Sequence, residues 1–158
     1  MRAKVDQYVG YFLAFLMAIM TLDVLWGVFT RYVVGSQSPW TEELARFLLI
    51  WIGLLGAAYV AGQHKHLAID ILPGKLTGTA KARLEAFIRL LIIGFSATVL
   101  IVGGARLVYI TYRLGQYSAA LQVPLSAVYA IVPISGLLII FYKLSAPVAP
   151  EGPKKREA

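Results

Sequence analysis

The chain has 158 residues, of which 59% are hydrophobic and only 15% are charged, and its mean hydropathy is +0.72. Soluble domains usually need about a quarter of their residues charged to cover an apolar core. The composition therefore excludes a soluble enzyme and indicates an integral membrane protein. The net charge of +7 does not indicate nucleic-acid binding, because the basic residues flank apolar stretches instead of forming one stripe. Without cysteine, the chain can form no disulfide and no cysteine-ligated metal centre.

Four apolar stretches predict four transmembrane helices and hence an all-α membrane protein. A helix needs about 20 residues to cross the hydrocarbon core. The apolar part of the third stretch is short, between Arg89 and Arg106, so we expect its helix to begin earlier, within residues 81–85. The predicted spans are residues 8–30, residues 39–62, residues 81–106 and residues 123–142.

The second span carries the clearest helix-start signal. Ser38 is a typical N-cap, Pro39 suits the first helical position, and Glu42 and Glu43 lie where the helix dipole favours negative charge. Glu42 and Arg46 are four positions apart, in the order that favours an ion pair worth about 0.2–0.5 kcal/mol.

Two segments lie largely outside the spans, the first of them overlapping the charged start of the third. Residues 63–84 alternate apolar with basic residues around Pro73, Gly74 and Gly78, which predicts a cytoplasmic loop with a short interfacial helix between spans two and three. Residues 146–158 are rich in proline and charge, which predicts a disordered basic cytoplasmic tail. We therefore expect one four-helix transmembrane domain, residues 1–145, followed by the tail.

Lysine and arginine predict how the chain lies in the membrane. With a cytoplasmic N-terminus, every basic residue except Arg31, Arg46, Arg106 and Arg113 falls on the cytoplasmic side, as the positive-inside rule requires. Both termini are then cytoplasmic. This topology brings to the outer interface an aromatic belt of Tyr32, Trp40, Tyr109, Tyr112 and Tyr117.

Asp23 is the single charged residue within the first span. An acidic residue inside a span by default suggests proton or ion coupling, and a buried interhelical contact is the alternative. Asp23 precedes Arg31 by about two helical turns, so it lies on the outer side of the membrane centre. His64 and His66 lie beyond the second span, which argues against an intramembrane heme or metal site. We expect no metal and no cofactor.

Two groups of residues predict contacts with other helices or proteins. Small residues at every fourth position of the second span form a ridge that lets another helix approach closely. Charged and aromatic residues gather at the outer end of spans one and two, which is typical either of interfacial anchoring or of a docking and subunit-contact surface. The ridge consists of Gly53, Ala57 and Ala61, broadened by Gly56, and the outer group of Arg31, Tyr32, Trp40, Glu42, Glu43 and Arg46.

Motifs of enzymes are missing from the sequence. It contains no phosphate-cradling glycine loop, no nucleophile elbow and no zinc-protease motif, so we expect no enzyme. The broken, repeated spans of many secondary transporters are missing as well, so the chain alone does not resemble a pump.

Residues 31–72 resemble the signature region of the small membrane subunit, the DctQ type, of tripartite ATP-independent periplasmic (TRAP) transporters. The shared pattern is an Arg-Tyr end of the first span, a Trp before a Glu-Glu pair, an Ala-Arg pair, a Gly-Ala-Ala stretch, and a His before an apolar-Asp segment. This chain supplies the pattern with Arg31, Tyr32, Trp40, Glu42, Glu43, Ala45, Arg46, residues 56–58, His66 and Asp70.

The resemblance implies a non-enzymatic subunit of the bacterial inner membrane. Such a subunit braces a large multi-span partner, which carries the substrate and sodium sites, and works with a soluble periplasmic binding protein that delivers a small organic acid. The outer group would organise contacts at the outer surface, while His66 and Asp70 would fix the cytoplasmic loop. Two other hypotheses stay open: a self-sufficient proton-coupled exporter acting as a homodimer through Asp23, and a heme-binding electron-transfer subunit.

Overall fold

The computed structural model of the chain describes residues 2–36, 38–62 and 79–145. Their regular structure is helical, apart from one isolated bridge between Tyr117 and Pro124. This confirms the predicted all-α class. The helices are α1 (Arg2–Phe29), α2 (Pro39–Gly62), α3 (Thr79–Phe95), α4 (Gly104–Arg113), α5 (Leu125–Tyr129) and α6 (Ile131–Ser145), with π-helical segments at Thr30–Val34 and Ser96–Gly103.

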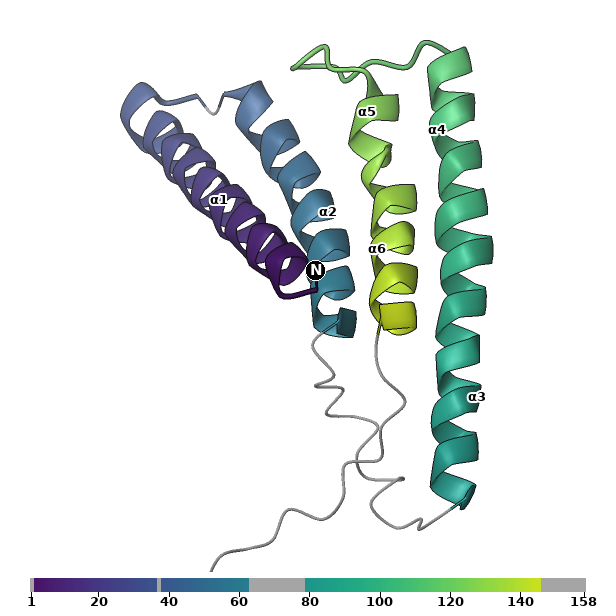
Figure 1. The fold of residues 1–158 in the computed structure, drawn as a ribbon. Helices are drawn as coiled ribbons and strands as arrows, with labels where there is room; N and C mark the ends of the chain where they lie inside the picture. Colours follow the sequence, from purple (N-terminus) through teal and green to yellow (C-terminus); the bar gives the residue numbers. More distant parts are fainter. Residues whose placement is uncertain (1, 37, 63–78, 146–158) are drawn as a thin grey trace, which may run out of the picture.

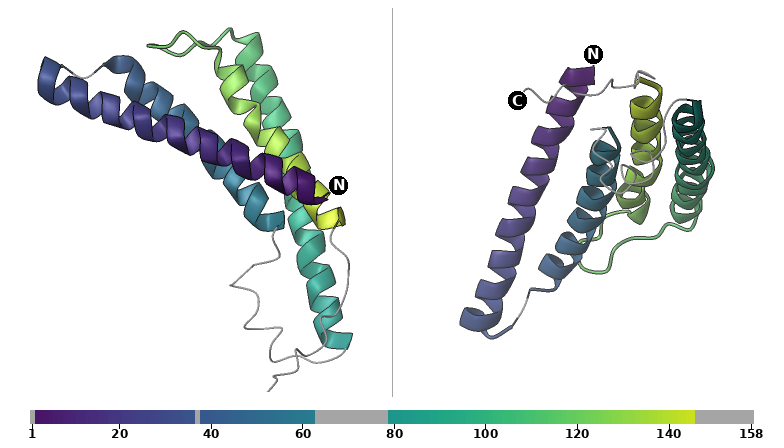
Figure 2. Two further views of the ribbon diagram at one scale, coloured as in Figure 1. Left: turned by 60° about the vertical axis from the view of Figure 1, so that its left-hand side comes forward. Right: turned by 90° about the horizontal axis from the view of Figure 1, so that it is seen from below.

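The helices stand in a row and do not close into a bundle (Figure 1). α1 packs on α2, α2 packs on α6, and α6 packs on the long helix that contains α3 and α4. The second view in Figure 2 shows the same order, with α1 at one edge and α3 at the other. The row therefore has two broad faces that no helix described here covers.

The chain runs up and down through this row (Figure 1). The connection between α1 and α2 and the loop between α4 and α5 lie together at one end, which we call the loop end. The start of α1, the end of α2 and the end of α6 lie at the opposite end, which we call the terminal end. This arrangement is the one that four sequential spans produce.

Four helical stretches are long and apolar enough to cross a membrane: Lys4–Val34, Pro39–Gly62, Ala86–Arg113 and Leu125–Ser145. They confirm the four predicted spans. The second has the predicted bounds, and a hydrogen bond from the Thr41 N–H to the Ser38 carbonyl (3.2 Å) marks its start. The predicted interfacial helix and the predicted tail, residues 146–158, lie outside the described residues.

The first span is longer than its predicted range of residues 8–30. Its helix begins at Arg2, and the π-helical turn Thr30–Val34 continues it for one more turn. The helix ends at Gly35, whose φ of +79° lies in the left-handed region that glycine adopts without strain. The predicted end at residue 30 is thus one turn too early.

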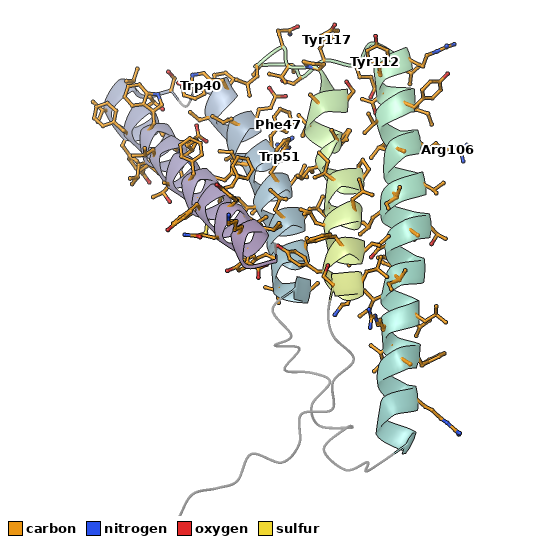
Figure 3. The ribbon with its side chains drawn as sticks, in the orientation of Figure 1. Trp40, Phe47, Trp51, Arg106, Tyr112 and Tyr117 are labelled. Atoms are coloured by element: carbon orange, nitrogen blue, oxygen red, sulfur yellow. The ribbon has the colours of Figure 1, made fainter. Side chains whose placement is uncertain are left out.

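The predicted end of the third span at Arg106 is wrong. α3, the π-helical segment Ser96–Gly103 and α4 form one continuous helix that ends only at Arg113. Arginine is a good helix former, and its long side chain can reach water from within a span, so Arg106 does not stop the helix. Figure 3 shows Arg106 on the side of α4 that faces away from the other helices.

A proline breaks the fourth span, which begins at Leu125, two residues after its predicted start. Pro133 has no N–H to donate to the preceding turn, so the regular hydrogen-bond pattern of the helix is interrupted there, at Ala130. α5 ends at Tyr129 and α6 begins at Ile131. The indole N–H of Trp51, on α2, donates to the Val128 carbonyl (3.1 Å) and joins α5 to the neighbouring helix.

The apolar core is small and lies between α1, α2 and α6. It is built on Leu16 of α1, Leu48 and Leu55 of α2, and Ile131 of α6, all nearly inaccessible. Phe12 meets Trp51 edge-on beside it, with ring centroids 6.5 Å apart. Most other large apolar side chains are exposed, as expected of a protein whose solvent is lipid.

Candidate functional site

Charged and aromatic side chains gather at the loop end of the row. Arg31 and Tyr32 lie in the π-helical turn that extends α1, and Trp40 lies in the first turn of α2. All three are exposed, and Tyr32 is 81% accessible. In Figure 3, Trp40, Tyr112 and Tyr117 lie at this same end. The fold therefore brings together the two aromatic groups that the sequence places on one side of the membrane.

Glu43 ties the loop between α4 and α5 to the start of α2. Its carboxylate accepts hydrogen bonds from the backbone N–H groups of Ala119 (3.1 Å), Ala120 (2.8 Å) and Leu121 (2.9 Å). Hydrogen bonds to an ionised acceptor are roughly twice as strong as neutral ones. Glu43 is therefore engaged within its own chain, although its place in the outer group predicts a contact with another protein.

The loop presents these N–H groups together because main-chain and side-chain bonds close it. The Ser118 N–H donates to the Val123 carbonyl (2.9 Å) across its base. Gln122 adopts a left-handed conformation, φ +54°, and its side-chain amide donates to the Ala119 carbonyl (3.1 Å). Successive N–H groups aimed in one direction form a concavity that attracts an anion. Here that anion is the carboxylate of Glu43.

Glu42 and Arg46, for which the sequence predicts an ion pair, do not form one in the structure. Both side chains are exposed. An exposed pair gains little energy, because water screens the charges and two long side chains must be held still. The two residues therefore remain open to other contacts at the loop end.

Asp23 lies in a pocket between α1 and α2 below the loop end. Its side chain is only 5% accessible, and neither carboxylate oxygen has a hydrogen-bond partner among the described residues. The pocket has a volume of about 160 Å³. Its lining consists of Asp23, Val24, Gly27, Val28, Arg31, Thr41, Glu42 and Ala45.

The predicted ridge of α2 is not covered by the helices described here. A methyl group added to Gly53 or Gly56 would meet nothing within 4 Å, and Ala57 is exposed. Ala61, at the end of the ridge, is half-buried. Since the described helices leave the space beside Gly53 and Gly56 open, a helix that packs on the ridge has to come from another chain or from outside the described residues.

Other glycines make the close contacts between helices. A methyl group on Gly136 of α6 would lie 2.8 Å from Cβ of Leu100, and one on Gly104 would lie 2.8 Å from Cγ1 of Val132. No pattern in the sequence distinguishes these glycines from the exposed ones. They become recognisable only once the order of the helices in the row is known.

His66 and Asp70, predicted to fix the cytoplasmic loop, lie outside the described residues. The three hydrogen bonds between Glu43 and the loop, in contrast, lie within the described residues and have no counterpart among the sequence predictions. Their donors are far from Glu43 in sequence, and they are backbone N–H groups, which cannot be recognised from residue identity.

The four spanning helices make the chain a multi-pass integral membrane protein. The sequence profile of the DctQ component of tripartite ATP-independent periplasmic transporters matches residues 20–148. The chain belongs to this family, and it is a small membrane subunit of the DctQ type. This confirms the resemblance found in residues 31–72.

Three relatives illustrate the family. The sialic acid TRAP transporter small permease protein SiaQ of Vibrio cholerae is 29% identical over 134 residues, covering 82% of this chain and 73% of the relative. The C4-dicarboxylate TRAP transporter small permease protein DctQ of Rhodobacter capsulatus is 30% identical over 112 residues, which cover 68% of this chain and 47% of the relative. The isethionate TRAP transporter permease protein DctMQ of Oleidesulfovibrio alaskensis is 28% identical over 127 residues, which cover 80% of this chain and 20% of the relative. The chain thus spans less than half of the last two relatives.

Proposed function

We propose that this chain is the non-catalytic small subunit of a sodium-coupled TRAP importer of an organic acid. It lies in the bacterial inner membrane, braces the large multi-span transport subunit and helps the soluble periplasmic binding protein to dock at the loop end. The names of the relatives, which specify sialic acid, C4-dicarboxylate and isethionate, support an organic acid as the substrate class.

The row of helices is the observation that carries the bracing role. In the most apolar 18 residues of the third span, only 6% are buried by the chain itself. In the corresponding part of the fourth span, 28% are buried. A single layer of helices offers a partner a broad apolar face. In lipid, helices associate through close packing and hydrogen bonds. The open ridge at Gly53 and Ala57 is suited to such packing.

The loop end supports a docking role. Arg31, Tyr32, Glu42 and Arg46 are exposed there and offer charges of both signs beside an aromatic ring. Such groups orient a soluble partner as it approaches. Glu43 already holds the neighbouring loop in place, so docking would lose less conformational entropy than docking to a free loop.

Basic residues support a cytoplasmic location of the terminal end. Arg2 and Lys4 lie at the start of α1, and Lys143 lies in the last turn of α6. The Arg89 guanidinium donates to the Leu144 carbonyl (3.3 Å), near the end of α6, where the helix dipole favours positive charge. This distribution follows the positive-inside rule.

The proposal is tested by purifying the tagged full chain from its native membrane in mild detergent and identifying co-purified proteins by mass spectrometry. A stoichiometric large multi-span protein is expected. In a second step, the two membrane subunits and the binding protein are reconstituted in liposomes with a sodium gradient. Uptake of an organic acid should require all three proteins, and uptake that proceeds unchanged without this chain would contradict the proposal.

The same preparations test the exporter hypothesis. Vesicles that contain only this chain should show no proton-driven efflux. Recovery of the chain solely with copies of itself, together with efflux that Asp23→Asn abolishes, would replace the importer by the homodimeric exporter.

A further inference from the structure

The Asp23 pocket contains a carboxylate that the described residues leave unsatisfied. Asp23 is 95% buried by its own chain's helices, and both of its oxygens lack a hydrogen-bond donor there. The hydroxyl group in the pocket lining is used elsewhere. Thr41 donates its hydroxyl hydrogen to the Ser38 carbonyl (2.8 Å).

A carboxylate in this position needs a partner. Asp23 lies within the stretch Lys4–Val34 that is long enough to cross the membrane. Burial of an acidic group without a hydrogen bond or counter-charge is costly in any protein, and acidic groups inside membranes are almost always paired or face a cavity. The described part of the chain supplies the cavity but no counter-charge in contact with the carboxylate.

The charges and walls of the pocket define what fits it. Two acidic residues, Asp23 and Glu42, and one basic residue, Arg31, line it, so its formal charge favours a single positive charge. Its other walls are largely apolar, formed by residues such as Val24 and Val28. An apolar stem with a cationic tip, as in lysine and arginine, matches this combination. The volume of about 160 Å³ is well above the roughly 10–15 Å³ that a cavity needs, on the same measure, to hold one water.

The mouth of the pocket lies on the same face of α2 as the open ridge. Glu42, at the mouth, is followed by Leu49, Gly53 and Val60 at intervals of seven, four and seven, which keep to one stripe of a helix. All four residues are exposed. A helix that packs along this stripe would therefore pass directly over the pocket.

We propose that the Asp23 pocket receives a lysine or arginine side chain from a membrane helix of the large transport subunit. The occupant belongs to a membrane-embedded partner because Asp23 lies about two helical turns below Arg31, deeper than a soluble protein docked at the loop end would reach. The same helix covers the stripe from Glu42 to Val60. This inference rests on the proposed function and adds the place and chemistry of the subunit contact.

Reaction with dicyclohexylcarbodiimide, a membrane-soluble reagent for carboxyl groups, tests the inference without any mutation. The isolated full chain and the complex with the large subunit are treated in parallel, and modification of Asp23 is measured by peptide mass spectrometry. We expect Asp23 to react in the isolated chain and to be protected about tenfold in the complex, because a paired carboxylate is neither protonated nor accessible. Equal modification in the two preparations, at any level, overturns the inference and favours water or a proton as the occupant.

Asp23→Asn and Glu42→Gln provide a second, independent test. Asn preserves the shape of the side chain and removes the charge, so the large subunit retained after washing should fall about tenfold with Asp23→Asn. Glu42→Gln, at the exposed mouth, should cause a smaller loss. Retention unchanged in Asp23→Asn overturns the inference while the proposed function stands. A wild-type chain that retains no large subunit overturns both.

Discussion

The carboxylate of Glu43 and the backbone N–H of Leu121 lie 2.9 Å apart, although 78 positions of sequence separate them. Ala119 and Ala120 donate to the same carboxylate. The start of α2 and the loop before α5 therefore form one unit. Together with the bond from Trp51 to the Val128 carbonyl, it joins the α1–α2 hairpin to the second half of the row.

Glu43→Gln should release the loop from α2. A glutamine has one acceptor oxygen, and its NH₂ group would face backbone N–H donors, so the three bonds cannot all persist. We expect hydrogen exchange of the backbone amides in residues 118–123 to accelerate several-fold in the purified chain, measured by mass spectrometry. Glu42→Gln changes the same charge at an exposed neighbour and should leave exchange unchanged. Full protection of the loop in Glu43→Gln would show that other contacts hold it.

The spans could be predicted from the sequence because they depend on local properties. Hydropathy and length identify a membrane helix wherever it packs, and proline at the first helical position fixed the start of the second span at Pro39. The end at Arg106 failed because a charged residue marks a membrane boundary but does not stop a helix. The turn that does stop it contains Gly115, whose φ is +57°.

The contacts between helices could not be predicted in the same way. Gly53 and Gly136 are both glycines inside apolar helices, yet the first faces open space and the second touches the neighbouring helix. Which of the two is in contact depends on the order of helices in the row. The sequence placed Glu43 in the outer group. Its hydrogen-bond donors are backbone N–H groups, which cannot be recognised from residue identity.

Gly136→Ala should destabilise the folded chain. The added methyl group would lie 2.8 Å from Cβ of Leu100 and 3.0 Å from Cγ1 of Ile101, so α6 and its neighbour must move apart. Overpacking of this kind typically costs about 1–3 kcal/mol. The free energy of unfolding can be measured by titrating detergent-solubilised protein with a denaturing detergent. Gly53→Ala is the matched control and should be neutral or stabilising, because alanine favours helix and meets nothing. Equal stability of both variants would contradict the close contact at Gly136.

Trp51→Phe should loosen the contact between α2 and α5. Phenylalanine keeps an aromatic ring beside Phe12 but cannot donate to the Val128 carbonyl. We expect a loss of roughly 0.6 kcal/mol in the free energy of unfolding, the average for hydrogen bonds between membrane helices. Trp26→Phe is the control, because Trp26 is half exposed and stacks on Phe29 of its own helix. The same loss in both variants would attribute the effect to tryptophan content and not to this bond.

Gly53→Leu should separate the stability of the chain from its assembly. Gly53 has open space around it and leucine favours helix, so the isolated chain should unfold at the same denaturant concentration as the wild type or a higher one. In the complex, the bulky side chain would stand where we propose that a helix of the large subunit packs, and co-purification of that subunit should fall. Gly94→Leu is the matched control on α3, since Gly94 is also exposed and meets nothing within 4 Å. If both variants retain the large subunit equally, the partner helix does not pack on the ridge. If both lose it, the partner covers the face of α3 as well, and the proposed contact extends across the row.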